Sequence, residues 1–278
     1  MKKINLNNNN LDGSVNMDIF STLIEMTELS ISDNPKAQFS FTSLPKDLTS
    51  LTRLTLGNIT LADGLVGIES LNAAVFKGLD VSNNGIEGTI PDYLYTIQNM
   101  DILYLDRNKL TGTISPNIGQ LASLSSLDLY GNSLEGTLPS EISTLKSMKY
   151  FEVSVNNLSG AVPWDGINNH WEKLKGLYMH HNSFSGPLGD LSLPTNVHEL
   201  DLGHNQFSGT IPLRLLQNAV ASPTDWVTIH LESNQLTGSV PENFSRFEKL
   251  DLRLENNKIG VSKNHFSCSV IVAREFFM

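Results

Sequence analysis

Imidazole and carboxylate side chains gather between residues 180 and 232, and these residue types offer the widest range of chemistry in the sequence. They are His180, His181, Asp201, His204, His230 and Glu232. Imidazole nitrogens and carboxylate oxygens are ligands that zinc and nickel accept in proteins. A metal-binding or enzymatic site at these clustered histidines is therefore one hypothesis for the function.

A catalytic site needs more than donor groups, and the motifs that usually accompany one are missing from the sequence. It contains no glycine-rich phosphate loop, no nucleophile elbow and no helical pair of histidines. The histidines are expected on flat strand faces, which seldom provide a concave site that excludes water. We therefore expect a protein that is not an enzyme, and we assign no catalytic residue, no metal ligand and no cofactor.

The charge balance and the single cysteine restrict the classes of partner and the compartment. With 19 Lys and Arg against 29 Asp and Glu, the formal net charge is -10, which disfavours a nucleic-acid partner because the phosphate backbone recruits basic residues. Cys268 is the only cysteine, so the chain cannot form an internal disulfide. The first residues do not resemble a secretory signal, and no apolar stretch is long enough for a membrane span. We expect the cell surface or the extracellular space if an upstream signal precedes this sequence, and the cytoplasm otherwise.

The elements that position these residues follow from an internal repeat. An asparagine recurs three residues after a leucine-like position, and from Asn84 onward the steps are 24, 24, 24, 26, 23, 29 and 23 residues. The gap from Asn34 to Asn84 is twice 25 residues, and Ile59 replaces the asparagine at its midpoint. The pattern predicts eleven units, marked by Asn9, Asn34, Ile59, Asn84, Asn108, Asn132, Asn156, Asn182, Asn205, Asn234 and Asn257.

Each part of the repeat has a structural role. The alternation Leu103-Tyr104-Leu105 predicts a short strand with two leucines inward and the tyrosine outward. The asparagine side chain turns the chain and pairs with backbone groups that would otherwise lack partners. A glycine such as Gly112 permits a tight bend, and a proline such as Pro139 leads into a half-buried turn or short helix. Stacked units then share a core that no single unit could bury.

The segments Val81 to Pro91 and Leu231 to Pro241 resemble the plant-type leucine-rich repeat, and the resemblance extends over roughly residues 3 to 260. It implies an α/β solenoid, a right-handed superhelix with a parallel β-sheet on the concave face and turns or short helices on the convex face. Such repeats form the ectodomains of receptor-like kinases and receptor-like proteins, which bind ligands on the concave face and its rim. We expect a repeat domain over residues 1–260, with a truncated first unit. The C-terminal tail over residues 261–278 has two interpretations, a partial cap on the core or a disordered segment.

Outward residues at equal register on stacked strands form columns, and tyrosines and carboxylates concentrate in these columns. Tyrosine offers rigid contact area with a polar tip, so a basic or hydroxyl-rich ligand fits this surface best. The alternative is that these positions are polar only because they face solvent. The ligand-binding residues predicted here are Tyr104, Asp106, Asp128, Tyr130, Tyr150, Glu152, Tyr178, His180, Asp201 and His230.

The hypothesis that accounts for most of these features is a non-enzymatic binding module, a fragment of a receptor-like ectodomain that recognises a protein, peptide or glycan. A co-receptor or kinase would then belong to the complete protein. The alternative is an intracellular scaffold of the same fold, and the metal or enzymatic site is the least favoured reading. The longest step places Leu213 to Trp226 in an enlarged convex loop, in which we expect Leu213, Leu215, Leu216 and Trp226 to pack inward.

Overall fold

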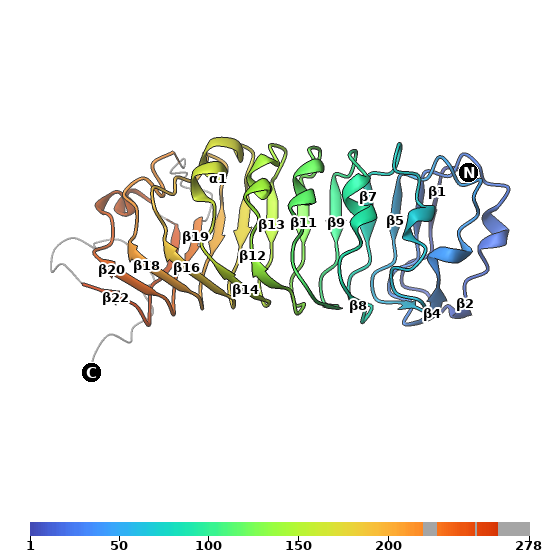
Figure 1. Cartoon of the computed structure of the whole chain (residues 1–278), viewed down its shortest axis with the longest axis horizontal. Helices are drawn as coiled ribbons and strands as arrows, with labels where there is room; N and C mark the ends of the chain where they lie inside the picture. Colours follow the sequence, from blue (N-terminus) through green and yellow to red (C-terminus); the bar gives the residue numbers. More distant parts are fainter. Residues whose placement is uncertain (219–226, 248, 261–278) are drawn as a thin grey trace. The chain divides into compact units, whose positions relative to one another are not determined.

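The computed structural model describes residues 1–218, 227–247 and 249–260, and these form two compact units, Met1–Leu134 and Glu135–Met278. Figure 1 shows both units as stacks of short strands and turns in chain order. The predicted tail over residues 261–278 and the predicted inward packing of Trp226 lie outside the described residues. In the described part of the chain, no helix reaches the length and apolar character that a bilayer crossing requires.

Unit 1 contains six parallel strands of the main sheet, and neighbouring strands within the unit are hydrogen-bonded to one another. The central residue of each strand points inward, and Leu54, Leu79 and Leu103 are buried completely or almost completely. The strands are β1 (Lys3–Asn5), β3 (Glu28–Ser30), β5 (Arg53–Thr55), β7 (Gly78–Asp80), β9 (Ile102–Tyr104) and β11 (Ser126–Asp128).

Unit 2 continues the pattern with five parallel strands of its own, whose registers pair Glu152 with Tyr178 and Asp201 with His230. These pairings confirm the predicted outward columns. The strands are β13 (Tyr150–Glu152), β15 (Gly176–Tyr178), β17 (Glu199–Asp201), β19 (Val227–His230) and β21 (Leu250–Arg253).

Further parallel strands follow the asparagine turns, where the sequence predicted only turns or short helices. In unit 2 they are β12 (Glu135–Thr137), β14 (Asn157–Gly160), β16 (Ser183–Pro187), β18 (Gln206–Thr210), β20 (Gln235–Gly238) and β22 (Lys258–Ile259). In unit 1 they are β2 (Asp12–Ser14), β4 (Lys36–Phe39), β6 (Thr60–Leu61), β8 (Glu87–Gly88) and β10 (Lys109–Leu110). The predicted solenoid is therefore confirmed, with additional short sheets beside the main one.

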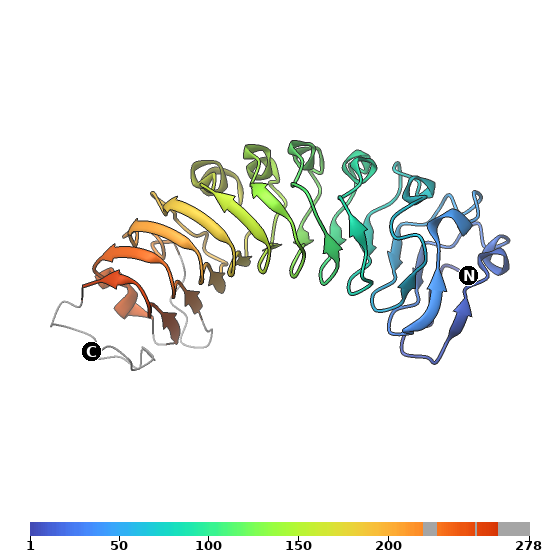
Figure 2. The ribbon, with the colours of Figure 1, turned by 60° about the horizontal axis from the view of Figure 1, so that its bottom comes forward.

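Short helices complete most repeats, and in Figure 2 they lie along one edge of each unit. The segment after Pro139 is a 3-10 helix in which Ile142 is fully buried, which confirms the predicted helical turn. The helices are η1 (Met17–Phe20), η2 (Phe41–Ser43), η3 (Ile68–Ser70), η4 (Asp92–Thr96), η5 (Pro116–Gln120), η6 (Ser140–Thr144), α1 (Trp164–His170) and η7 (Glu242–Arg246).

The asparagine ladder forms as predicted and holds each strand at a fixed distance from the next. The Asn108 side-chain amide donates to the carbonyl oxygens of Val81 at 3.0 Å and Leu105 at 2.9 Å, and its Oδ1 accepts from the N–H of Ile86 at 3.0 Å. The residue before each ladder position is left-handed in most repeats, as in Arg107 with φ 51°. This conformation, which L-residues other than Asn, Asp and Gly rarely adopt, is the backbone turn that directs the amide inward.

One prediction about the enlarged loop is wrong. Leu215 and Leu216 are fully buried, as expected, but the Leu213 side chain is 67% exposed. Leu215 donates its N–H to the Pro212 carbonyl oxygen at 3.0 Å. The turn that this hydrogen bond closes directs Leu215 and Leu216 toward the core and leaves Leu213 on its outer side.

Candidate ligand-binding face

The outer face is defined here by two sets of side chains. One set comes from the residues of the main-sheet strands that point away from the core, and the other from the second residue after each of these strands. Strand alternation places them there because successive side chains point to opposite sides of a sheet. All ten predicted binding residues lie on the outer face, four in unit 1 and six in unit 2.

In unit 1, the four predicted residues contact one another or neighbouring polar residues. The Tyr104 hydroxyl lies 3.1 Å from the Ser126 hydroxyl, and the Arg107 guanidinium lies 5.4 Å from the centre of the Tyr130 ring. Asp106 is only 7% exposed and lies 3.4 Å from Arg107. Asp106 therefore contributes little contact area to the outer face.

Asp128 and Asp106 are held in an environment that disfavours their ionised form. Burial raises the pKa of Asp128 to about 6, and the nearby charges of Asp106 and Asp80 add to this effect. The Tyr130 backbone N–H, which donates to Asp128 Oδ1 at 3.0 Å, and the Arg107 guanidinium oppose it. Burial likewise raises the pKa of Asp106.

In unit 2, two tyrosines and two glutamates lie together over strands β13, β15 and β17. The Tyr178 hydroxyl donates to the Glu199 carboxylate, and its ring lies over Gly176, where a Cβ would come within 2.7 Å of the ring. Burial and the hydrogen bond to Glu199 raise the pKa of Tyr178. The Glu152 carboxylate accepts from the Ser154 N–H at 2.7 Å, and Tyr150 is 44% exposed.

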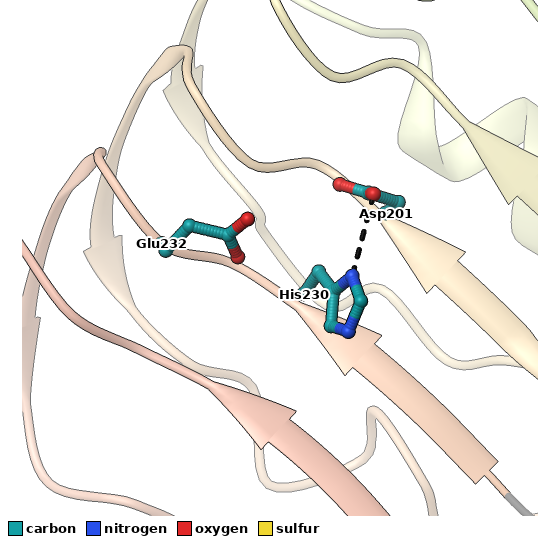
Figure 3. Close-up of side chains that lie close together, drawn as sticks. All are labelled: Asp201, His230 and Glu232. Carbon is teal, nitrogen blue, oxygen red and sulfur yellow. Dashed lines mark hydrogen bonds and ion pairs between the residues drawn. The ribbon is translucent and has the colours of Figure 1, made fainter. Parts of the chain in front are cut away.

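Histidines and aspartates form a second cluster on unit 2, over strands β17, β19 and β21. His230 Nδ1 lies 3.4 Å from Asp201 Oδ2, as Figure 3 shows, and its Nε2 lies 3.3 Å from Asp251 Oδ2. The hydrogen bond with Asp201 is the main cause of the raised pKa of His230. Burial would raise the pKa of Asp201, but the hydrogen bonds from His230 and the Gly203 N–H together lower it.

The two histidines that precede the ladder residues Asn182 and Asn205 stack on one another. The His181 and His204 rings stack with centroids 4.1 Å apart, and His180 Nδ1 lies 2.9 Å from His181 Nδ1. Burial lowers the pKa of His180, against the attraction of Asp201. His181 and His204 therefore lie between the outer face of unit 2 and its asparagine ladder, because each immediately precedes a ladder asparagine.

Three acidic residues that lie beside these side chains in unit 2 were not among the predicted ligand-binding residues, although Glu232 was counted in the cluster of possible metal ligands. Glu199, Glu232 and Asp251 all occupy outward positions, but none was selected as a binding residue. The strand register could have selected them. Asp251 is two residues before Arg253, the strand partner of His230. Glu199 is paired with Gly176 on the adjacent strand.

The repeats match a known family model, the Leucine Rich Repeat, at residues 76–97, 99–121, 123–145 and 196–218. A probable leucine-rich-repeat receptor-like serine/threonine-protein kinase of Arabidopsis thaliana is 30% identical over 69 residues, which are 25% of this chain and 7% of the kinase. The family model describes a repeat and not a catalytic domain, and no catalytic family is indicated for these residues.

Solved structures extend the similarity over most of the chain. The ectodomain of the receptor kinase GASSHO1/SCHENGEN3 from Arabidopsis thaliana, solved in complex with CASPARIAN STRIP INTEGRITY FACTOR 2, is 28% identical with a TM-score of 0.70. That match covers 93% of this chain and 33% of the ectodomain. The Arabidopsis receptor kinase HAESA, solved with the peptide hormone IDA and the co-receptor SERK1, shares the fold at 23% identity, a TM-score of 0.59, and coverage of 93% and 54%.

The chain thus spans about a third of the GASSHO1/SCHENGEN3 ectodomain and a small part of the kinase relative. The repeat spacing, the asparagine ladder, the parallel sheet and the family matches agree with one another. This protein is a solenoid of stacked repeats, four segments of which match the Leucine Rich Repeat model, and it resembles the ectodomains of plant receptor kinases.

Proposed function

We propose that this chain is a non-enzymatic binding module of the receptor-ectodomain type, and that the outer face of unit 2 binds a basic, hydroxyl-bearing peptide. The observation that carries the proposal is the grouping of Tyr150 and Tyr178 with Glu152 and Glu199 on adjacent strands. Aromatic side chains give contact area at low entropic cost, and carboxylates select cationic partners. The HAESA ectodomain, which is in complex with a peptide hormone, shows that the same fold can accommodate a peptide.

Rigidity supports this assignment because a preformed surface loses little entropy on association. The Tyr178 ring is held over Gly176 and its hydroxyl is bonded to Glu199, while a backbone N–H fixes Glu152. The exposed Tyr150 side chain stands at the edge of this group. A peptide strand laid across β13, β15 and β17 would meet both tyrosines and both glutamates.

The test measures the binding of the purified chain to an array of short synthetic peptides that differ in net charge and in serine and threonine content. We expect basic, hydroxyl-rich peptides to bind best, and the double variant Tyr150→Ala/Glu199→Gln to weaken their binding by about 2–3 kcal/mol, roughly 30- to 150-fold.

The matched control is Gln206→Ala/Glu242→Gln, which changes two exposed unit 2 side chains on β18 and η7, away from the outer face. This control variant should bind the peptides as the parent chain does. Equal losses in both double variants, or a preference for acidic peptides, would contradict the proposal.

A further inference from the structure

Three metal-ligating side chains of different types converge on the outer face of unit 2. Asp201 ends β17, His230 ends β19, and Glu232 follows His230 by two residues. One ligand atom from each lies within 4.8 Å of the ligand atoms of the other two. Figure 3 shows the Asp201 carboxylate, the His230 ring and the Glu232 carboxylate around one shared space.

The convergence follows from register and from one glycine. Asp201 and His230 are directly paired on adjacent strands, and Glu232 lies on the same side as His230 because side chains alternate along an extended chain. The Glu232 carboxylate lies over Gly203, where a Cβ would come within 2.8 Å of Glu232 Oε1. A larger residue at position 203 would therefore push the carboxylate out of the cluster.

One carboxylate oxygen of the cluster lacks a partner that a cation could supply. Glu232 Oε2 is buried and has no hydrogen-bond partner among the described residues, and a buried oxygen of an acidic group without a partner is costly. The nearby guanidinium of Arg253 pairs instead with Asp251, at 3.7 Å. A bound cation would supply the contact that Glu232 Oε2 lacks.

The donor set and its spacing select the kind of cation. Calcium and magnesium prefer oxygen ligands throughout, whereas one imidazole with two carboxylates suits zinc. Bonds of about 2.1 Å in tetrahedral geometry place neighbouring ligand atoms about 3.4 Å apart. His230 Nδ1 and Asp201 Oδ2 are separated by 3.4 Å.

The second nitrogen of His230 completes the arrangement. Its Nε2 lies 3.3 Å from Asp251 Oδ2, so the ring can donate to a carboxylate while Nδ1 faces the cluster. Histidine ligands of zinc commonly donate their other N–H to a carboxylate in this way, which fixes the tautomer and the ring orientation. Asp251 is therefore a positioning residue.

We propose that Asp201, His230 and Glu232 bind one zinc ion on the outer face of unit 2, with Asp251 orienting His230 and one coordination position open to water. This site is independent of the peptide-binding residues proposed above, since it shares none of Tyr150, Glu152, Tyr178 and Glu199. Failure of either proposal leaves the other standing.

The test titrates zinc chloride into the untagged, chelator-treated chain by calorimetry. We expect one zinc ion per chain, a loss of affinity of more than about 100-fold in Glu232→Gln, and a loss of roughly 10- to 100-fold in Asp251→Asn. Cobalt(II), added in place of zinc, should give the intense visible absorption of four-coordinate cobalt, and this absorption should disappear in Glu232→Gln.

Two controls separate this site from other sources of zinc affinity. Glu255→Gln changes the next acidic residue of the same column and should leave zinc binding unchanged, and the thermal melting of every variant reports whether it folds. His181→Asn removes one ring of the stacked histidines, where asparagine tolerates the left-handed backbone. Absence of stoichiometric zinc binding, or loss of it in His181→Asn but not in Glu232→Gln, would overturn the proposal.

Discussion

At the scale of single residues, the outer face of unit 1 contains two carboxyl groups whose pKa values are raised in the folded state. Burial and the charges of nearby carboxylates raise the pKa values of Asp128 and Asp106. The Arg107 guanidinium and backbone N–H donors lower them. Natural proteins commonly retain such unfavourable groups where a surface has a task other than stability.

The raised pKa of Asp128 predicts a specific dependence of stability on pH. The pKa of Asp128 in the folded state, about 6, exceeds the ordinary aspartate value of 3.8, so the folded state binds a proton more tightly than the unfolded state. The contribution of Asp128 therefore becomes more favourable as the pH falls from 7 to about 4, and it is constant below that. Asp128→Asn keeps an acceptor for the Tyr130 N–H and should raise stability at pH 7 by about 1 kcal/mol.

Urea unfolding of the parent chain and of Asp128→Asn at pH 7 and pH 4.5 measures this difference. The stabilisation should shrink at the lower pH, because the parent carboxyl is then largely protonated in the folded state. Asp12→Asn, at an exposed position on β2, controls for the loss of one negative charge. A stabilisation that is equal at both pH values would show that burial of Asp128 is not its cause.

At the scale of elements, the ladder asparagines link strands that local sequence alone could not align. Asn205 donates to the carbonyl oxygens of Met179 at 3.0 Å and Leu202 at 3.2 Å, and it accepts from the Phe184 N–H at 3.0 Å. Without the amide, the buried Phe184 N–H would lose this acceptor, whereas the Met179 and Leu202 carbonyl oxygens would still accept from the ladder amides of Asn182 and Asn234.

Asn205→Leu preserves the approximate size of the side chain and removes these hydrogen bonds. We expect unfolding to require about 2 kcal/mol less free energy, because the buried Phe184 N–H is left without this acceptor. The control is Asn157→Ala, at an exposed position of β14, which should change stability by less than about 0.5 kcal/mol. Similar small effects in both variants, measured by urea unfolding, would mean that the ladder contributes little.

The sequence was sufficient to predict the strands, the ladder and the outward columns, because each depends on a residue type repeated at a fixed spacing. It was not sufficient for β16 and β18, since segments such as Ser183–Pro187 carry no two-residue alternation and become strands only when stacked on their neighbours. The burial of Asp106 and the position of Glu232 over Gly203 were also not predicted. The position of Glu232 depends on a small residue in the adjacent repeat, because a Cβ at position 203 would come within 2.8 Å of Glu232 Oε1.

At the scale of the whole molecule, the net charge of -10 acts on any cationic partner before contact. Electrostatic attraction of this kind raises the association rate and is screened by salt, with a Debye length of about 10 Å at 0.1 M. We expect the association rate of a basic peptide to fall at least about 10-fold between 0.02 and 0.5 M sodium chloride. The dissociation rate should change much less.

Stopped-flow or surface-based kinetics at several salt concentrations check this prediction. A neutral peptide of the same length is the control, and its association rate should be almost independent of salt. An association rate of the basic peptide that is equally insensitive would indicate that the charge of the chain has no part in recognition.

The asparagine ladder also has a consequence for how this protein ages. Asn84 is followed by Gly85, a pair in which the side-chain amide is easily lost in a free peptide. In the fold, however, the amide of Asn84 is bonded to the Val81 carbonyl oxygen at 2.8 Å and to that of Leu56 at 2.9 Å, and its Oδ1 accepts from the Ile59 N–H at 3.0 Å. A side chain held in this way cannot turn to meet the Gly85 nitrogen. Deamidation at Asn84 should therefore require local unfolding of this repeat. The rate at which the deamidated form accumulates would then report how often the repeat opens.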